Sequence, residues 1–187
     1  MRVKARVMPS QQFAAQFRAA IEEGSMGRRS QSLADRIEEG ANGLAVFSEG
    51  LSDADWRKPM VSGTDRRTVG VIVHHVASMY PIEIGAAQAV ASGKAVMDVS
   101  WDNVAQINAE HAAGNGATTK EAALDLLRKN SREAAAAVRA MKDEDLDRAA
   151  PFSLAYGAPM TTQFVIEDHA LRHAWHHLAR IRKALGR

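Results

Sequence analysis

The feature that most constrains the fold is the spacing of apolar residues, which recur every three or four positions along four long stretches. In the first stretch, Leu33, Ile37 and Leu44 fall on one helical face. The second begins near Thr68, the third follows residue 118, and the fourth runs from about residue 162 to 185. No segment of length alternates with the period of a strand. The pattern predicts an all-α chain whose apolar faces meet in a four-helix bundle.

Local signals refine three of these helices. Pro81 lies inside the second helix and should distort it, because proline donates no backbone N–H and its ring clashes with the preceding turn. The residues expected on one face of that helix are Val69, Ile72, Val76, Met79 and Glu83. Thr118 and Glu121 fit a capping box that would begin the third helix. The stripe predicted for the third helix is Leu124, Leu127, Ser131, Ala134, Val138 and Met141.

The chain is expected to divide into an arm and a domain. Residues 1–31 form the predicted arm, with a short helix over residues 10–23, and residues 32–187 form the bundle domain. A further short helix is predicted from Trp101 to Ala113. Trp56, Trp101 and Trp175 occupy helix-packing positions, so we expect them in the core.

Composition excludes several classes of function. The chain has no cysteine, which excludes disulfides, a thiolate zinc site and a cysteine nucleophile. A formal net charge of +2, with no basic stripe carrying interleaved aromatics, argues against nucleic acid as a partner. No apolar run is long enough for a membrane span, and the N-terminus lacks a secretory signal. A cytoplasmic protein without a membrane partner is therefore expected.

Histidines are concentrated in the last helix, where four of the seven lie between His169 and His177. At about 100° per residue, His173 and His177 fall at the edge of the apolar sector and turn toward the bundle interior. The same count places Phe164 in the apolar sector. His169 and His176 fall on the outer, arginine-bearing side and are expected at the surface.

The pair His173 and His177 has the i, i+4 spacing with which one helix offers two nitrogens to one metal ion. On the second helix His75 lies closer to the apolar face than His74 does, so His75 is the better third ligand. A single inward histidine is usually a hydrogen-bonded core residue, but three in an apolar interior require a metal ion or a buried acid. Such a site keeps an open coordination position, and zinc and nickel both accept imidazole.

The same segments resemble the DinB-like superfamily. The resemblance covers residues 32–185 and rests on residues 68–76 (TVGVIVHHV) and 173–181 (HAWHHLARI), supported by residues 51–56 (LSDADW) and 101–108 (WDNVAQIN). The last two segments resemble in particular the mycothiol-dependent maleylpyruvate isomerase-like branch. The resemblance implies an up-down-down-up four-helix bundle, a divalent metal ion held by His75, His173 and His177, and a homodimer.

Three functions agree with these features. The first is an enzyme whose metal ion activates a low-molecular-weight thiol for S-transfer or isomerisation; lacking cysteine, the chain would need an external thiol. The second is a metal-dependent hydrolase in which water replaces the thiol. The third is a non-catalytic, metal-stabilised stress or ligand-binding module.

Overall fold

The computed structural model of the chain describes residues 28–60 and 66–187. The helix predicted over residues 10–23 lies outside the described residues. The end of the predicted arm, residues 28–31, forms the first turn of helix α2, which spans Arg28–Glu49. The division into an arm and a domain at residue 31 stays a prediction.

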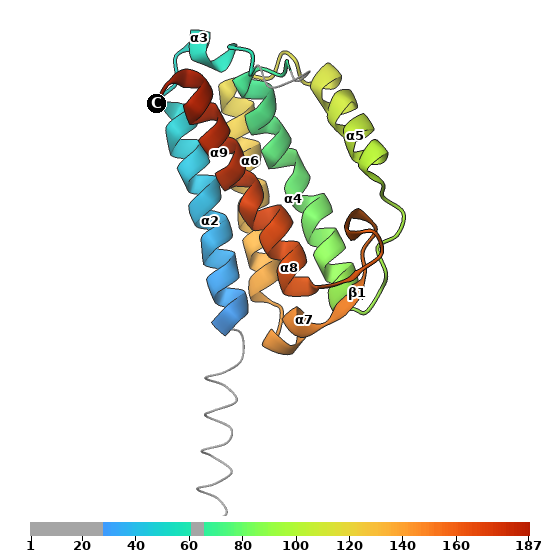
Figure 1. Cartoon of the computed structure of the whole chain (residues 1–187). Helices are drawn as coiled ribbons and strands as arrows, with labels where there is room; N and C mark the ends of the chain where they lie inside the picture. Colours follow the sequence, from blue (N-terminus) through green and yellow to red (C-terminus); the bar gives the residue numbers. More distant parts are fainter. Residues whose placement is uncertain (1–27, 61–65) are drawn as a thin grey trace, which may run out of the picture.

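Four long helices form the bundle (Figure 1). They are α2, α4 (Val69–Ala91), α6 (Lys120–Arg139) and a last helix made of three consecutive segments: α8 (Thr162–Ile166), the π-helical turn η2 (Glu167–Leu171) and α9 (Arg172–Leu185). In Figure 1, α2 runs up, α4 and α6 both run down, and the last helix runs up. The predicted four-helix bundle and its up-down-down-up order are therefore confirmed.

Shorter elements connect the long helices. They are α3 (Asp53–Trp56), α5 (Trp101–Gly114), α7 (Asp143–Asp147), β1 (Ala149–Pro151), the 3-10 turn η1 (Ser153–Ala155) and β2 (Pro159–Thr161). Strands β1 and β2 pair antiparallel, with Ala150 opposite Met160. The backbone N–H of Val96 donates to the carbonyl of Pro151 at 2.9 Å, which ties this hairpin to the end of α4. Three residues per strand are too few to give a recognisable alternation, so the sequence did not indicate the hairpin.

The predicted helical stripes form the core. All six residues of the stripe predicted for the third helix are buried, although the last, Met141, lies just beyond the end of α6; Leu33, Ile37 and Leu44 of α2 are buried as well. The prediction for the tryptophans holds for Trp56, which is buried, and is wrong for Trp101 and Trp175, which are 56% and 40% exposed. Trp175 lies across Gly40 so closely that a Cβ there would be 2.7 Å from its Nε1. Within residues 28–60 and 66–187, no helix is long and apolar enough to cross a membrane.

The cap of α6 lies one residue later than predicted. The side chain of Thr119, not Thr118, accepts the backbone N–H of Ala122 and begins the helix. The carbonyl of Thr118 instead accepts the indole N–H of Trp56 at 3.2 Å. Adjacent threonines offer the same cap chemistry, and this tertiary contact with Trp56 accompanies the later start.

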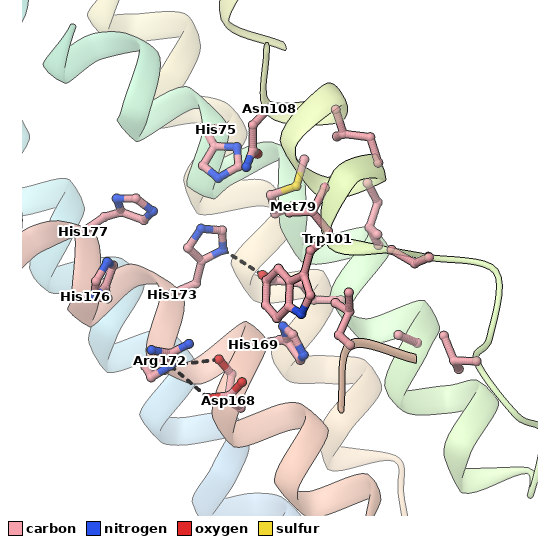
Figure 2. Close-up of a pocket in the computed structure, with 18 of the residues that line it drawn as sticks. His75, Met79, Trp101, Asn108, Asp168, His169, Arg172, His173, His176 and His177 are labelled. Atoms are coloured by element: carbon pink, nitrogen blue, oxygen red, sulfur yellow. Dashed lines mark hydrogen bonds and ion pairs between the residues drawn. The ribbon is translucent and has the colours of Figure 1, made fainter. Parts of the chain in front are cut away.

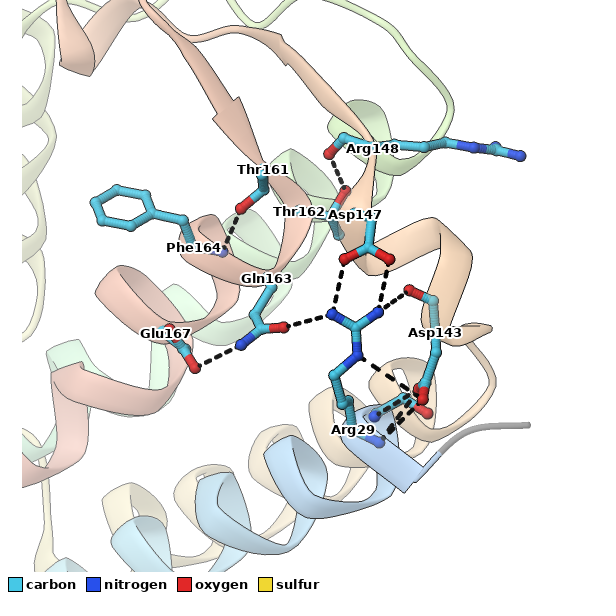
Figure 3. A network of polar contacts seen from close by, with 10 residues as sticks. Arg29, Asp143, Asp147, Arg148, Thr161, Thr162, Gln163, Phe164 and Glu167 are labelled. Atoms are coloured by element: carbon cyan, nitrogen blue, oxygen red, sulfur yellow. Dashed lines mark hydrogen bonds and ion pairs between the residues drawn. The ribbon is translucent and has the colours of Figure 1, made fainter. Parts of the chain in front are cut away.

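Arg29 joins the start of α2 to helices α7 and α8, more than a hundred residues later in the chain (Figure 3). Its guanidinium donates to both carboxylate oxygens of Asp147, at 2.7 and 2.8 Å, and to Gln163 of α8 at 3.2 Å. Its backbone N–H donates to the carboxylate of Asp143, so an acidic residue of α7 lies at the positive end of α2. Arg29 thereby joins α2, α7 and α8 at one end of the bundle.

Pro81 does not interrupt α4, contrary to a simple reading of its sequence. A proline at this position removes the N–H that would bond the carbonyl of Ala77 one turn earlier. The buried side-chain amide of Asn130 in α6 donates to that carbonyl at 2.8 Å instead. A second helix therefore supplies the hydrogen bond that proline removes, and α4 continues to Ala91.

Removing this amide should destabilise the bundle in a way that depends on Pro81. We expect Asn130→Ala to lower the free energy of unfolding by about 1–3 kcal/mol, because it leaves the carbonyl of Ala77 buried without a donor. In a Pro81→Ala background the new N–H can bond that carbonyl, so the same change should cost clearly less. Urea unfolding of the four proteins as a double-mutant cycle measures the difference. Equal costs in both backgrounds would contradict this account of Asn130.

Candidate metal centre

The three histidines selected from the sequence meet between α4 and α9 (Figure 2). His75 and His177 are each 5% exposed, and His173 is half-buried. The ring centroid of His173 lies 4.9 Å from those of both His75 and His177, and His75 and His177 are 5.7 Å apart. One ring nitrogen of each lies within 4.8 Å of those of the other two, as a shared metal ion requires.

The π-helical turn η2 determines which side chains of the last helix face this point. A π turn holds one more residue than an α turn, so it rotates everything before it by roughly 100° relative to everything after it. The helical phase predicted from the sequence was therefore correct for His173 and His177, which follow the turn. It was wrong for Phe164, which precedes the turn and is 47% exposed instead of packed in the core.

Glu83 is the site residue that sequence reasoning missed. Its Oε1 lies 2.7 Å from Nδ1 of His173, and both side chains are largely buried. With the carboxylate as acceptor, Nδ1 is the donor, which leaves Nε2 of His173 as the nitrogen with a free lone pair. A carboxylate that holds a metal-ligating histidine in this way is a common feature of metal sites. The available signal was an acidic residue on the otherwise apolar face of α4.

The environment of His177 favours its neutral form. Burial is the main cause that lowers the pKa of His177, and the neighbouring His173 and His75 lower it further. Its Nδ1 is buried and has no hydrogen-bond partner among the described residues. A neutral imidazole with a buried, unsatisfied nitrogen is suited to bind a divalent metal ion, so the donor set fits the cation that the fold family implies.

A pair of histidines, His74 and His111, lies beside the group of three. Nδ1 of His74 and Nε2 of His111 are 2.9 Å apart, and the hydroxyl of Ser78 donates to the carbonyl of His74 at 2.8 Å. Burial lowers the pKa of both imidazoles. His111 is half-buried and joins α5 to α4 through this hydrogen bond.

His169 and His176, both expected at the surface, line the cavity beside the triad. His169 is half-buried, with its ring centroid 5.5 Å from that of Phe152, so the prediction is wrong for this residue. His176 is exposed as predicted, and its ring lies 5.1 Å from that of His177. Neither belongs to the group of three that can share a metal ion.

The histidines open onto a cavity of about 380 Å³. Helices α4 and α5 and the hairpin region give it a mainly apolar wall, and α9 gives it a polar one. The apolar wall contains Met79, Ile82, Val96, Val99, Trp101, Val104, Ile107, Phe152 and Leu154. The α9 wall contains Arg172, His173, His176, His177 and Arg180. The volume is within the range of small-molecule sites.

Comparison with known proteins identifies the family. The model of the DinB superfamily matches residues 36–181. The chain belongs to the DinB superfamily. A search of curated proteins found no significant match to this DinB-superfamily protein.

Solved structures support the fold at low sequence identity. YfiT from Bacillus subtilis, described as a probable metal-dependent hydrolase with an unusual four-helix bundle topology, has a TM-score of 0.66 at 16% identity over 98% of this chain and 91% of its own. The colibactin self-resistance protein ClbS, in complex with double-stranded DNA, has a TM-score of 0.65 at 14% identity over 87% and 97%. The mycothiol-dependent maleylpyruvate isomerase has a TM-score of 0.60 at 14% identity over 81% and 60%.

The lowered pKa of His177 predicts acid sensitivity of the metal-free protein. An unfolded histidine takes up a proton below about pH 6.5, whereas folded His177 resists protonation, so acid favours the unfolded state. We expect the free energy of unfolding in a chelator to fall below pH 6.5. His177→Leu should reduce that slope by about 1.4 kcal/mol per pH unit.

Urea unfolding at several pH values between 7.5 and 5 measures the slope. His176→Leu is the matched control, because this neighbouring histidine is exposed and its replacement should change the slope less. If the profiles of the wild-type protein and His177→Leu ran parallel, the lowered pKa of His177 would be wrong.

Proposed function

We propose that this DinB-superfamily protein binds one divalent metal ion through His75, His173 and His177. The single observation that carries the proposal is that these three imidazoles, from two helices, bring ring nitrogens within 4.8 Å of one another in an apolar interior. The buried Nδ1 of His177 has no hydrogen-bond partner among the described residues, which supports a cation in this group. Zinc and nickel are the proposed ions, because imidazole suits both.

We propose further that the centre serves an enzyme that acts on a low-molecular-weight thiol. A bound divalent cation would lower the pKa of such a thiol, so that thiolate is present at neutral pH. The chain supplies no thiol of its own, since it has no cysteine. Its residues would instead prepare the site: Glu83 holds the ring of His173 in place, and the apolar wall of the cavity limits access of water. In S-transfer, an S–C bond forms as the bond to the leaving group breaks, and the thiol proton passes to solvent.

A metal-dependent hydrolase is the second candidate, favoured by the description of the structurally similar YfiT. The same three histidines and the same cavity would serve it, with water in place of the thiol. ClbS is described in complex with double-stranded DNA, but the present chain has a net charge of only +2. We therefore propose a small molecule, not nucleic acid, as the partner.

Metal content tests the centre directly. Untagged protein should contain about one equivalent of zinc or nickel by elemental analysis, because three histidines make one site. His173→Ala and His177→Ala should each lose most of it, since two imidazoles bind far more weakly than three. Glu83→Gln should keep the three ligands but weaken affinity about 10–100-fold, because the neutral amide holds His173 less firmly.

His176→Ala is the matched control, since it removes a neighbouring histidine of α9 that lies outside the proposed ligand set. It should retain the wild-type metal content. Thermal unfolding with and without a chelator would show the same order, as metal that binds only the folded state raises its stability. A wild-type protein with little metal, and no effect of His173→Ala on content or stability, would refute the metal centre.

Thiol transfer can be tested with the metal-loaded protein and monochlorobimane as a general electrophile. Mycothiol, bacillithiol and glutathione should be compared. At least one should react faster with the protein than without it, and His177→Ala should abolish this increase in rate. His176→Ala should retain its metal and serves as the control for general damage. If metal is present and no thiol reacts, S-transfer is contradicted, and hydrolysis of a generic ester should then be assayed as the second candidate.

A further inference from the structure

Helix α5 carries an inward face that the protein does not cover. Trp101, Val104, Asn108 and His111 follow one another at spacings of three, four and three, which places them on one side of the helix. An amphipathic helix normally buries such a face, but none of the residues described in α5 is buried. Figure 2 shows the side chains of Trp101 and Asn108 extending from α5 toward the histidines. This face borders a space of ligand size in place of the core.

The helix is held by polar contacts at its ends. Ser100 and Asn103 form a capping box at the start, and His111 bonds to His74 of α4 near the end. Between these points, Trp101, Val104 and Ile107 line the cavity, and Trp101 remains 56% exposed. An apolar molecule in the cavity would remove this surface from water, at a gain that scales with the apolar area covered.

The opposite side of the cavity is basic. Arg172, His176 and Arg180 are spaced four residues apart along α9, and all three line the cavity. Arg172 is paired with Asp168 one turn earlier, at 3.1 Å. The described residues that line the cavity include three arginines (Arg67, Arg172 and Arg180) and two carboxylates (Asp168 and Glu83), an excess of one positive charge when the histidines are left out of the count. That excess favours an anionic group on whatever molecule occupies the cavity.

We propose that the cavity binds a small carboxylic acid with a flat apolar body, which lies against Trp101, Val104 and Ile107 and directs its carboxylate toward the Arg172–Arg180 face of α9. This molecule is the acceptor substrate, an assignment that rests on the proposed function; its binding does not. The aromatic side chains Trp101 and Phe152 favour an aromatic ring, which stacks or packs edge-on with ring centroids about 4.5–7 Å apart. A cavity of about 380 Å³ admits a small molecule and not a folded partner.

The test uses the full-length protein with and without one equivalent of Zn²⁺, and three probes. Cinnamate carries the ring and the carboxylate, cinnamyl alcohol carries the ring alone, and acetate carries the carboxylate alone. NMR titration should give the tightest binding for cinnamate, weaker binding for the alcohol and none measurable for acetate. Binding of the two ring-bearing probes should be present in both metal states.

Variants assign the two ends of the molecule. Trp101→Ala should weaken both ring-bearing probes at least about tenfold, because the main apolar contact is lost. Arg172→Gln combined with Arg180→Gln should weaken cinnamate to the level of cinnamyl alcohol and leave the alcohol unchanged. Tyr156→Asn removes an aromatic side chain that is exposed outside the cavity and should change neither. Ile107→Ser provides a second test of the α5 wall if Trp101→Ala unfolds.

The proposal is overturned if acetate binds as well as cinnamate, or if neither Trp101→Ala nor Ile107→Ser weakens the ring-bearing probes. It is also overturned if no probe binds and Trp101→Ala converts a dimer to a monomer by light scattering, since α5 would then face a second copy. Metal content measured on the same samples separates this result from the proposed function. Bound metal without probe binding refutes the carboxylic acid alone, and probe binding without metal refutes only the metal centre.

Discussion

The interior of the bundle must accommodate three imidazoles between α4 and α9, two helices whose other buried residues are mainly apolar. His75 and His177 are almost fully buried, and burial lowers the pKa of His177, so its charged form is unfavourable there. Other features of the site are consistent with that constraint. Glu83 satisfies one nitrogen of His173, the π turn orients the histidines that follow it, and the cavity gives the group one open side. A cation would bind the ring nitrogens that these contacts leave without a partner. The carboxylate of Glu83, paired with His173, would offset part of the charge of the cation.

The sequence was sufficient for the fold and for the three central histidines. Apolar residues repeat in each long helix, and His173 and His177 both follow the π turn, within the regular helix α9. The errors have physical causes. A π turn leaves no mark in a periodic pattern, so Phe164 was placed inside, and a tryptophan beside a cavity has the same spacing as one in a core, so Trp101 was misplaced. Glu83 needed the third dimension, since its partner is ninety positions away.

Polar contacts between distant segments keep the helices continuous and joined around the site. Asn130 supplies the hydrogen bond that Pro81 removes from α4, at the carbonyl of Ala77, two residues after His75. Arg29 connects the start of α2 to α7 and to α8, the segment that leads into the π turn. In both contacts a residue from another segment bonds a backbone group that its own helix leaves without a partner: the carbonyl of Ala77 in α4, and the N–H of Arg29 at the start of α2. The placement of α4 and of the last helix, which carry the three histidines, therefore depends partly on residues outside that group.

Helices α4 and α6 run in the same direction, so the chain between them must return along the length of the bundle. That return contains α5, the outer wall of the cavity, which contributes no buried residue to the core. The bundle and the wall are thus structurally separable: substitutions in α5 would reshape the cavity while the four helices keep their packing. The shape and chemistry of the cavity can therefore be altered through one helix without disturbing the core on which the histidines are mounted.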